Sequence, residues 1–188
     1  MDKERILKAT LDVYREKGIK FRMDDIAKEL SISKKTIYVI FKDKKALINE
    51  MVDYCFDSIK ECEKEVIEDR SLSTIDKIKK ILGVMPSTYA DIDLTQLYVL
   101  KEKYPLTYKK VEARLESGWE VTMKLLEQGQ EEGVIRNVSL PLFKSIFEAS
   151  LEQFFKRDVL VRSHLTYNEA LTEIVSILVE GIRVKEND

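Results

Sequence analysis

The sequence predicts an all-α protein of about nine helices, with a small N-terminal head and a larger C-terminal body. Its 188 residues include only six Gly and three Pro, and 35% of them are charged. Lys, Glu, Leu and Ile are abundant, and these straight-chain or apolar residues suit helices with few breaks. Apolar positions recur at helical spacing, and no segment alternates as a strand does. We expect two domains, residues 1–46 and 47–188.

Three short helices and tight turns are predicted for the head. The first has Ile6, Leu7, Leu11 and Tyr14 on one face and stops at Gly18, a residue suited to a left-handed helix end. Ser33 is placed to accept a backbone hydrogen bond at the start of the third helix. The predicted ranges are Lys3–Lys17, Met23–Leu30 and Lys34–Phe41.

The body helices are predicted from capping residues and stops. Asp43, Ser73 and Thr166 stand at helix starts, and Asp76 and Glu169 complete capping boxes with the latter two. Pro86 ends or kinks a helix, Gly133 stops one, and Pro141 suits a first turn. The predicted ranges are residue 44 to about 67, 74 to about 84, Leu94–Glu102, Leu106–Glu132, Leu140–Lys156 and 167 to about 184.

Charge is distributed unevenly along the chain. Residues 1–50 hold 13 Lys and Arg against 9 Asp and Glu, whereas the remainder holds 19 against 25. A basic head on an acidic body suggests that only the head meets a polyanion. Cys55 and Cys62 lie seven residues apart on one predicted helix, about 10 Å along its axis, and therefore cannot pair. No signal peptide or bilayer-spanning run is evident, so we expect a soluble, cytoplasmic protein.

The third predicted helix has the character of a DNA-reading helix. Ile37 and Phe41 face inward, which leaves basic, polar and methyl-bearing side chains outside. Lys donates to guanine acceptors in the major groove, and Thr and Val methyls contact the thymine methyl. The free N–H groups after Asp43 form a phosphate site at the next helix, reinforced by Lys44. From charge pattern alone, the alternative is a basic helix face that is merely solvated.

The segment from Ile26 to Leu47 resembles the signature of the TetR family of regulators. It reads Ile26-Ala27-x-x-Leu30-Ser31-Ile32-Ser33-Lys34-Lys35-Thr36-Ile37-Tyr38-x-x-Phe41-x-x-Lys44-x-x-Leu47. The resemblance implies a sequence-specific transcriptional regulator, a repressor that a small-molecule effector releases from double-stranded operator DNA. The side chains that it places on DNA are Lys34, Lys35, Thr36, Tyr38 and Val39, with Lys44 on a phosphate.

Two residues depart from the family pattern. Arg22 stands where Thr commonly caps the second helix, so that cap is lost, although Arg22 can itself reach a phosphate. Ile40 stands where His is frequent. Both departures bear on which operator is bound, not on whether DNA is bound.

The body resembles the family only in plan. Gly129 and Gly133 stand at the end of a helix, as they often do before the family's dimerisation helices, which implies that Leu140–Lys156 and the last helix pair with a second copy in a homodimer. The alternative is that the apolar residues of these two helices all belong to the core of a single chain. A ligand pocket is expected among the central helices, lined by Trp119, Met123, Tyr89, Tyr98 and Phe147, with ordinary core packing as the alternative.

The expected effector is hydrophobic or cationic. Aromatic lining suits such compounds, and the acidic body disfavours a strongly anionic one.

Other function classes are less well supported by the sequence. The single histidine, His164, has no acid or nucleophile nearby, and no phosphate loop or metal-binding cluster is present, so we expect neither an enzyme nor a cofactor or metal site. A helical adaptor or nucleoid-type binder that reads no particular sequence remains open. So do an activator and a regulator that has lost its ligand response.

Overall fold

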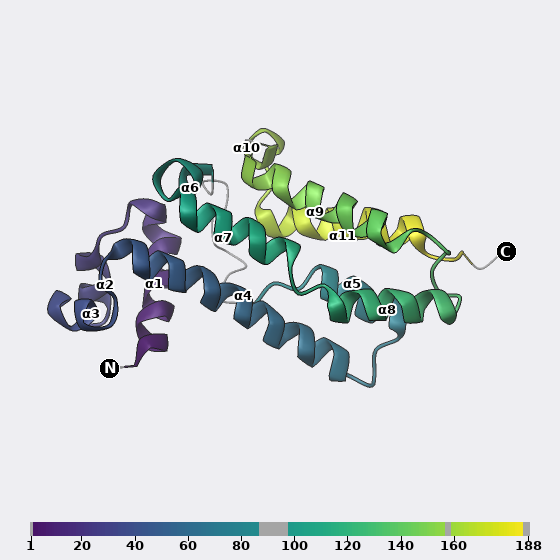
Figure 1. Cartoon of the computed structure of the whole chain (residues 1–188), viewed down its shortest axis with the longest axis horizontal. Helices are drawn as coiled ribbons and strands as arrows, with labels where there is room; N and C mark the ends of the chain where they lie inside the picture. The colour runs from purple at the N-terminus through teal and green to yellow at the C-terminus, as the bar shows by residue number, and fades with distance from the viewer. Residues whose placement is uncertain (1, 87–97, 157–158, 186–188) are drawn as a thin grey trace.

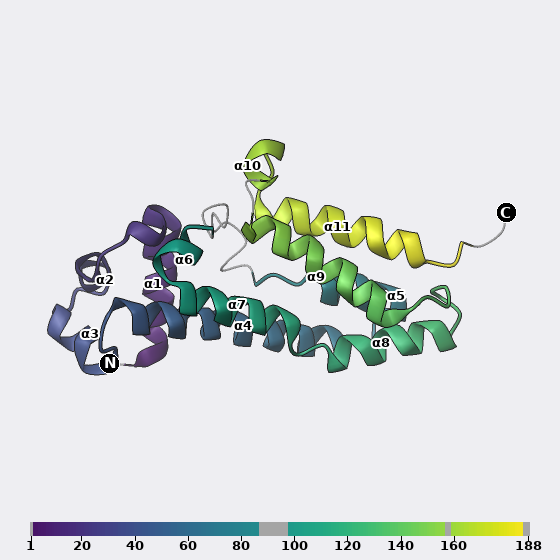
Figure 2. The same cartoon turned by 45° about the horizontal axis from the view of Figure 1, so that its top comes forward.

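The computed structural model describes residues 2–86, 98–156 and 159–185. These residues form helices and no named strand; one antiparallel bridge joins Ile135 to Arg183. Figures 1 and 2 show the head at one end of an elongated body. The helices are α1 (Lys3–Lys17), the 3-10 turn η1 (Gly18–Lys20), α2 (Met23–Glu29), α3 (Lys34–Ile40), α4 (Lys44–Glu68), α5 (Thr74–Leu82), α6 (Tyr98–Lys103), α7 (Pro105–Glu116), α8 (Glu120–Glu131), α9 (Leu140–Lys156), α10 (Val159–Ser163) and α11 (Tyr167–Ile182).

The head consists of α1, α2, α3 and the first turns of α4 around a shared core. Phe21, Ile26, Ile37 and Leu47 are almost completely buried there. The helices begin at the capping residues that the sequence predicts: the Asp2, Ser33 and Asp43 side chains each accept a backbone N–H of the first turn. Such caps satisfy donors that a helix start leaves unpaired.

Helix α4 joins the head to the body. Its Leu47 and Ile48 lie in the head core, and its later turns pack against α5 and α7. Figure 1 shows it running from the head, across α1, and along the body. One helix therefore takes part in both the head core and the body core.

The body has an apolar core between α4, α5, α7, α8, α9 and α11. Helix α5 packs on α8, and α9 packs on α11. Caps again set the helix starts: Ser73 accepts from the Asp76 N–H, and Thr166 and Glu169 form the expected capping box. Gly133, with φ of 71°, ends the α8 segment as predicted.

The predicted helix Leu106–Glu132 is wrong. It is two helices, α7 and α8, separated at residues 117–119. Gly118 has φ of 76°, a left-handed conformation that cannot continue a right-handed helix, so the chain turns there. Trp119 consequently lies at the start of α8 instead of in mid-helix. The additional short helix α10 was not predicted. Of the predicted Leu94–Glu102 helix, residues 98–102 lie in α6 as expected, and residues 94–97 lie outside the described residues.

Two further expectations concern the cysteines and the membrane. Cys55 and Cys62 are both free, as their spacing on α4 predicts. None of the helices in the described part of the chain has the length and apolarity that crossing a bilayer requires.

Candidate DNA-binding helix and ligand cavity

Helices α2 and α3 are joined by a tight turn that fixes their relative orientation. Ser31 has φ of 54°, and the Ile32 N–H donates to the Ala27 carbonyl at 2.9 Å. The Ser33 hydroxyl then accepts the Thr36 N–H at 3.2 Å, which starts α3. Ile37 is completely buried beneath α3, so the opposite face of this helix must point away from the protein.

The outer face of α3 exposes large side chains to solvent. Val39 is 79% exposed and Tyr38 46% exposed, and both Lys34 and Lys35 lie at the surface. Exposed large apolar residues on a short, rigid helix indicate a contact surface. The predicted assignment of inner and outer faces is therefore correct for this helix.

Two of the predicted contact residues already have partners within the head. Lys34 Nζ lies 2.9 Å from an Asp24 oxygen on α2, and this bond raises the pKa of Lys34, which stays charged. The Thr36 hydroxyl lies 3.0 Å from the Ser33 hydroxyl. A DNA contact by Lys34, which stays a prediction, would have to replace this ion pair, whereas the exposed Lys35 presents its charge outward.

Lys44 occupies a different position from the one expected for a phosphate contact. Its ammonium donates to the carbonyls of Ile19, at 2.8 Å, and of Phe21, and it lies 4.0 Å from the centroid of the Phe21 ring. Burial, and then the nearby Lys103, lower the pKa of Lys44. In this structure Lys44 connects the start of α4 to η1 and the residue after it by hydrogen bonds, and its phosphate contact stays a prediction.

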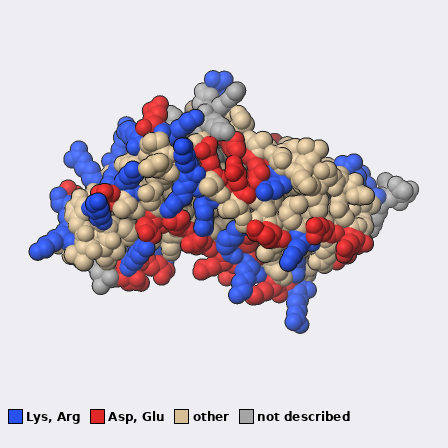
Figure 3. Space-filling model, in the orientation of Figure 1, with Lys and Arg blue, Asp and Glu red and all other residues tan. Residues whose placement is uncertain are grey.

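The exposed charges around α2 and α4 extend the candidate surface. Arg22 stands at the N-cap of α2 and is exposed, and its backbone N–H donates to Asp25 at 2.7 Å. A guanidinium has no acceptor, so Arg22 supplies no side-chain cap, as predicted. Lys42 and Lys45 flank the α4 start and are exposed, yet sequence reasoning singled out only Lys44. Figure 3 shows Lys and Arg side chains projecting from this end of the molecule.

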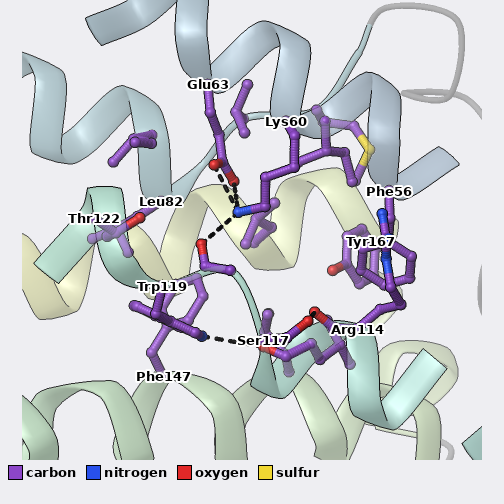
Figure 4. Close-up of a pocket in the computed structure, with 18 residues that line it drawn as sticks. Phe56, Lys60, Glu63, Leu82, Arg114, Ser117, Trp119, Thr122, Phe147 and Tyr167 are labelled. Carbon is purple, nitrogen blue, oxygen red and sulfur yellow. Dashed lines mark hydrogen bonds and ion pairs between the residues drawn. The ribbon is translucent and has the colours of Figure 1, made fainter. Parts of the chain in front are cut away.

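The body contains a cavity of about 110 Å³ between α4, α5, α7, α8, α9 and α11. Its walls are mostly apolar and aromatic, which is typical of a small-molecule site. Trp119 and Phe147 pack edge to face, with centroids 5.5 Å apart and an interplanar angle of 82°. Figure 4 shows side chains from several helices converging on this space.

The predicted pocket residues are placed in different ways. Trp119 and Phe147 line the cavity, whereas Met123 is not among its lining residues in the described chain. Tyr89 and the side chain of Tyr98 lie outside the described residues. Sequence reasoning missed Phe56 and Lys60 on α4, and its error over the α7–α8 break hid the position of Arg114 near the end of a helix.

Three charged side chains lie among the cavity residues. Lys60 Nζ donates to both Glu63 oxygens, at 2.8 and 2.7 Å, and to the Gly118 carbonyl at 2.8 Å. Arg114 donates to Asp57 at 2.5 Å, and its Cζ lies 5.3 Å from the centroid of the Phe56 ring. Figure 4 shows Lys60 and Glu63 reaching from α4 toward the break between α7 and α8.

Polar contacts connect α4 to α7 and to the α7–α8 break on successive turns, in an arrangement that we term the polar ladder. Three of its hydrogen bonds join side chains: Asn49–Thr107 (2.5 Å), Asp53–Lys110 (2.6 Å) and Asp57–Arg114 (2.5 Å). The fourth joins the Lys60 ammonium to the Gly118 backbone carbonyl (2.8 Å). Residue numbers rise together along both sides, so α4 and α7 run in the same direction. The ladder therefore extends from the cavity residues Arg114 and Lys60 to Asn49, beside the head core.

Helices α9 and α11 leave an apolar face uncovered. Leu142 is 60% exposed and Ile177 63% exposed, and Ile146 is also exposed. Gly181 has open space where a Cβ would stand. Figure 3 shows few charged side chains over these helices. Other apolar residues of α9 and α11 are buried in the core of the body, as the alternative interpretation expects: Phe143, Phe147, Leu151, Phe154, Leu171, Val175 and Ile182.

A turn-linked helix pair that exposes its second helix on a basic head, joined by one long helix to a body with an apolar cavity, defines a DNA-binding transcriptional regulator. Residues 6–51 match the family described as bacterial regulatory proteins, tetR family. The head of the chain is therefore similar to that of TetR-family regulators.

Similarity to known proteins extends beyond the head. An uncharacterized HTH-type transcriptional regulator, YvaF of Bacillus subtilis (strain 168), is 28% identical over 186 residues, 99% of this chain and 97% of that protein. A TetR transcription regulator from Haloarcula marismortui has a TM-score of 0.71 at 16% identity, covering 97% of this chain and 98% of that one. FadR of Bacillus subtilis, solved in complex with stearoyl-CoA, has a TM-score of 0.68 at 18% identity, covering 97% and 100%.

Proposed function

We propose that the protein is a homodimeric repressor that binds operator DNA through α3 and is released when a small molecule enters the body cavity. In this proposal residues 1–46 form the DNA-binding domain and residues 47–188 the ligand-binding and dimerisation domain. The exposed outer face of α3, held over the buried Ile37, is the observation that carries it.

DNA recognition follows from the chemistry of that face. Lys35 and, after exchange of Asp24, Lys34 supply donors for guanine, while Val39 and Thr36 supply methyl groups for thymine. Tyr38, Arg22 and Lys44 bind the phosphate backbone and fix the register. Lys42 and Lys45 join this set because they are exposed beside the start of α4.

Dimerisation is supported by the uncovered apolar face of α9 and α11. Ile174, Ile177, Leu178 and Gly181 follow the spacing of one helix face, and Ile146 lies on the neighbouring helix. A two-fold contact through this face brings the same residues of both copies together. Such a dimer presents two α3 helices to half-sites about 34–36 Å apart on one side of the duplex.

Release by a ligand is supported by the path from cavity to head. Phe56, Lys60 and Glu63 of α4 line the cavity, and the polar ladder ties α4 to α7. A ligand that fits better when α4 is displaced favours a different separation of the two heads, in proportion to its differential affinity for the two states. That FadR, a structural neighbour, holds stearoyl-CoA supports an effector site in a body of this fold.

The test is a fluorescence anisotropy titration of the full chain against DNA from immediately upstream of its own gene. A scrambled duplex of the same length and composition serves as the DNA control, and Val39→Ala as the variant control for the α3 face. The proposal expects affinity for the upstream DNA to exceed that for scrambled DNA by about 10³-fold or more at physiological salt.

Equal affinity for upstream and scrambled DNA leads to a selection from random duplexes, because the operator can lie elsewhere. If that selection enriches no sequence, the nucleoid-type alternative is correct and the repressor proposal is overturned. Saturation by an added compound without any change in operator affinity rules that compound out as the releasing ligand.

A further inference from the structure

The size of the body cavity limits what it can admit. An apolar cavity of about 150 Å³ holds a benzene molecule in another protein, and this one measures about 110 Å³. A single six-membered ring therefore fits with a small movement of the walls. Phe56, Trp119 and Phe147 supply ring faces and edges against which such a group packs.

The cavity offers a ligand more free hydrogen-bond donors than free acceptors among the groups described below. Several acceptors already receive a hydrogen bond: both Glu63 oxygens and the Gly118 carbonyl receive one from Lys60, and the Leu115 carbonyl receives the Trp119 indole N–H at 3.1 Å. Arg114, by contrast, has five N–H donors, of which one bonds to Asp57 within the described chain. A ligand that brings its own acceptors meets open donors of Arg114, whereas a ligand that brings donors competes with Lys60 for the Glu63 oxygens and the Gly118 carbonyl.

The positive charges near the aromatic wall also favour an anionic ligand over a cationic one. Lys144 Nζ lies 5.7 Å from the centroid of the Trp119 ring, and Lys60 is bonded to the adjacent Gly118. A cationic ligand over Trp119 would face these two ammonium groups, of which Lys60 is paired with Glu63 at 2.7 Å and Lys144 with Glu148 at 3.5 Å. The net negative charge of the body, from which the sequence favours a hydrophobic or cationic effector, matters less because exposed charges beyond about 8–10 Å are screened.

We infer that the cavity binds a small organic carboxylate, a single apolar ring bearing one carboxyl group, with the ring between Phe56, Trp119 and Phe147 and the carboxylate on Arg114. The inference deepens the proposed function and rests on it for its regulatory consequence. A carboxylate on Arg114 shares the guanidinium charge with Asp57, and so weakens one rung of the polar ladder between α4 and α7.

The experiment compares three compounds of one shape and different charge: cyclohexanecarboxylate, cyclohexanecarboxamide and cyclohexylmethylammonium. Trp119 is the single tryptophan of the chain and lines the cavity, so its fluorescence reports occupancy without DNA. The carboxylate is expected to bind at least about tenfold more tightly than the amide, because a hydrogen bond between two charged groups is stronger than one to a neutral group. The ammonium compound is expected to bind no better than the amide.

Two variants of Arg114 test whether this residue causes the preference for the carboxylate over the amide. Arg114→Gln is expected to reduce the ratio of carboxylate to amide affinity to within about threefold, and Arg114→Lys to restore part of it. Lys109→Gln is the matched control, since it removes the same charge from an exposed position of α7 that does not line the cavity. It is expected to leave the ratio unchanged.

The inference is overturned if none of the three compounds changes Trp119 emission at millimolar concentration, or if the amide or ammonium compound equals the carboxylate. It is also overturned if the carboxylate preference persists in a folded Arg114→Gln protein. The wild-type comparison depends on no variant, so misfolding of a variant does not remove the test. Operator affinity of the ligand-free protein, measured on the same preparation, reports separately whether DNA binding itself fails.

Discussion

Gly118→Ala tests the break between α7 and α8. At φ of 76°, an alanine pays about 1–2 kcal/mol for the left-handed conformation. Its Cβ would also lie 2.8 Å from Lys60 Cε and 3.0 Å from Lys60 Nζ, so the lysine must move and lose its hydrogen bond to the Gly118 carbonyl. That bond contributes about 0.5–1.5 kcal/mol, which brings the expected loss in free energy of unfolding to about 1.5–3.5 kcal/mol.

A double-mutant cycle separates the two contributions. Equilibrium urea unfolding is followed by far-ultraviolet circular dichroism at one protein concentration. In a Lys60→Ala background, Gly118→Ala is expected to cost about 1 kcal/mol less than in the wild type, because the clash and the bond are both absent.

Gly133→Ala is the matched control for the backbone. Its φ is 71°, but nothing lies within 4 Å of the position of an added Cβ. It is therefore expected to cost about 1–2 kcal/mol in both backgrounds. The reasoning is refuted if Gly118→Ala costs no more than Gly133→Ala, or if the Lys60→Ala background leaves the cost of Gly118→Ala unchanged.

Three further predictions concern the DNA face, the uncovered apolar face and the cysteines. Lys35→Gln is expected to lower operator affinity, and Val39→Asp to abolish selectivity in the same anisotropy assay; unchanged affinities would remove α3 from the DNA contact. Ile177→Glu is expected to yield monomers in light scattering, and a persistent dimer would exclude this face. Burial raises the pKa of Cys55 to about 12, so at pH 8 maleimide labelling should modify Cys62 faster, as peptide mass mapping would show; equal rates would contradict that assignment.

Much of the head is predictable from sequence because local rules decide its structure. Ser33 and Asp43 cap their helices by short-range hydrogen bonds, and Gly18 ends α1 with positive φ. The burial of Ile37 and exposure of Val39 follow from helical spacing and one apolar face. Such features depend on residues within one or two turns of each other.

The cavity is less predictable because it depends on contacts between residues distant in the sequence. Lys60 meets Gly118 across 58 positions, and Arg114 meets Asp57 across 57. Gly118 within an apparent helical pattern does not by itself reveal positive φ, since glycine also occurs inside helices at modest cost. Lys44 is a similar case: its contacts with Ile19 and Phe21 arise from folding of the head, and no local pattern signals them.

Selection from random duplex DNA, followed by sequencing of the bound fraction, tests most directly that α3 reads an operator as part of a dimer. The wild-type protein and Val39→Ala are run in parallel at the same salt concentration. We expect the wild type to enrich an inverted repeat with half-sites about one helical turn apart, and the variant to relax one position in each half-site. Enrichment of no motif, or of a motif that Val39→Ala leaves unchanged at every position, would contradict the assignment of α3 as the helix that reads the operator.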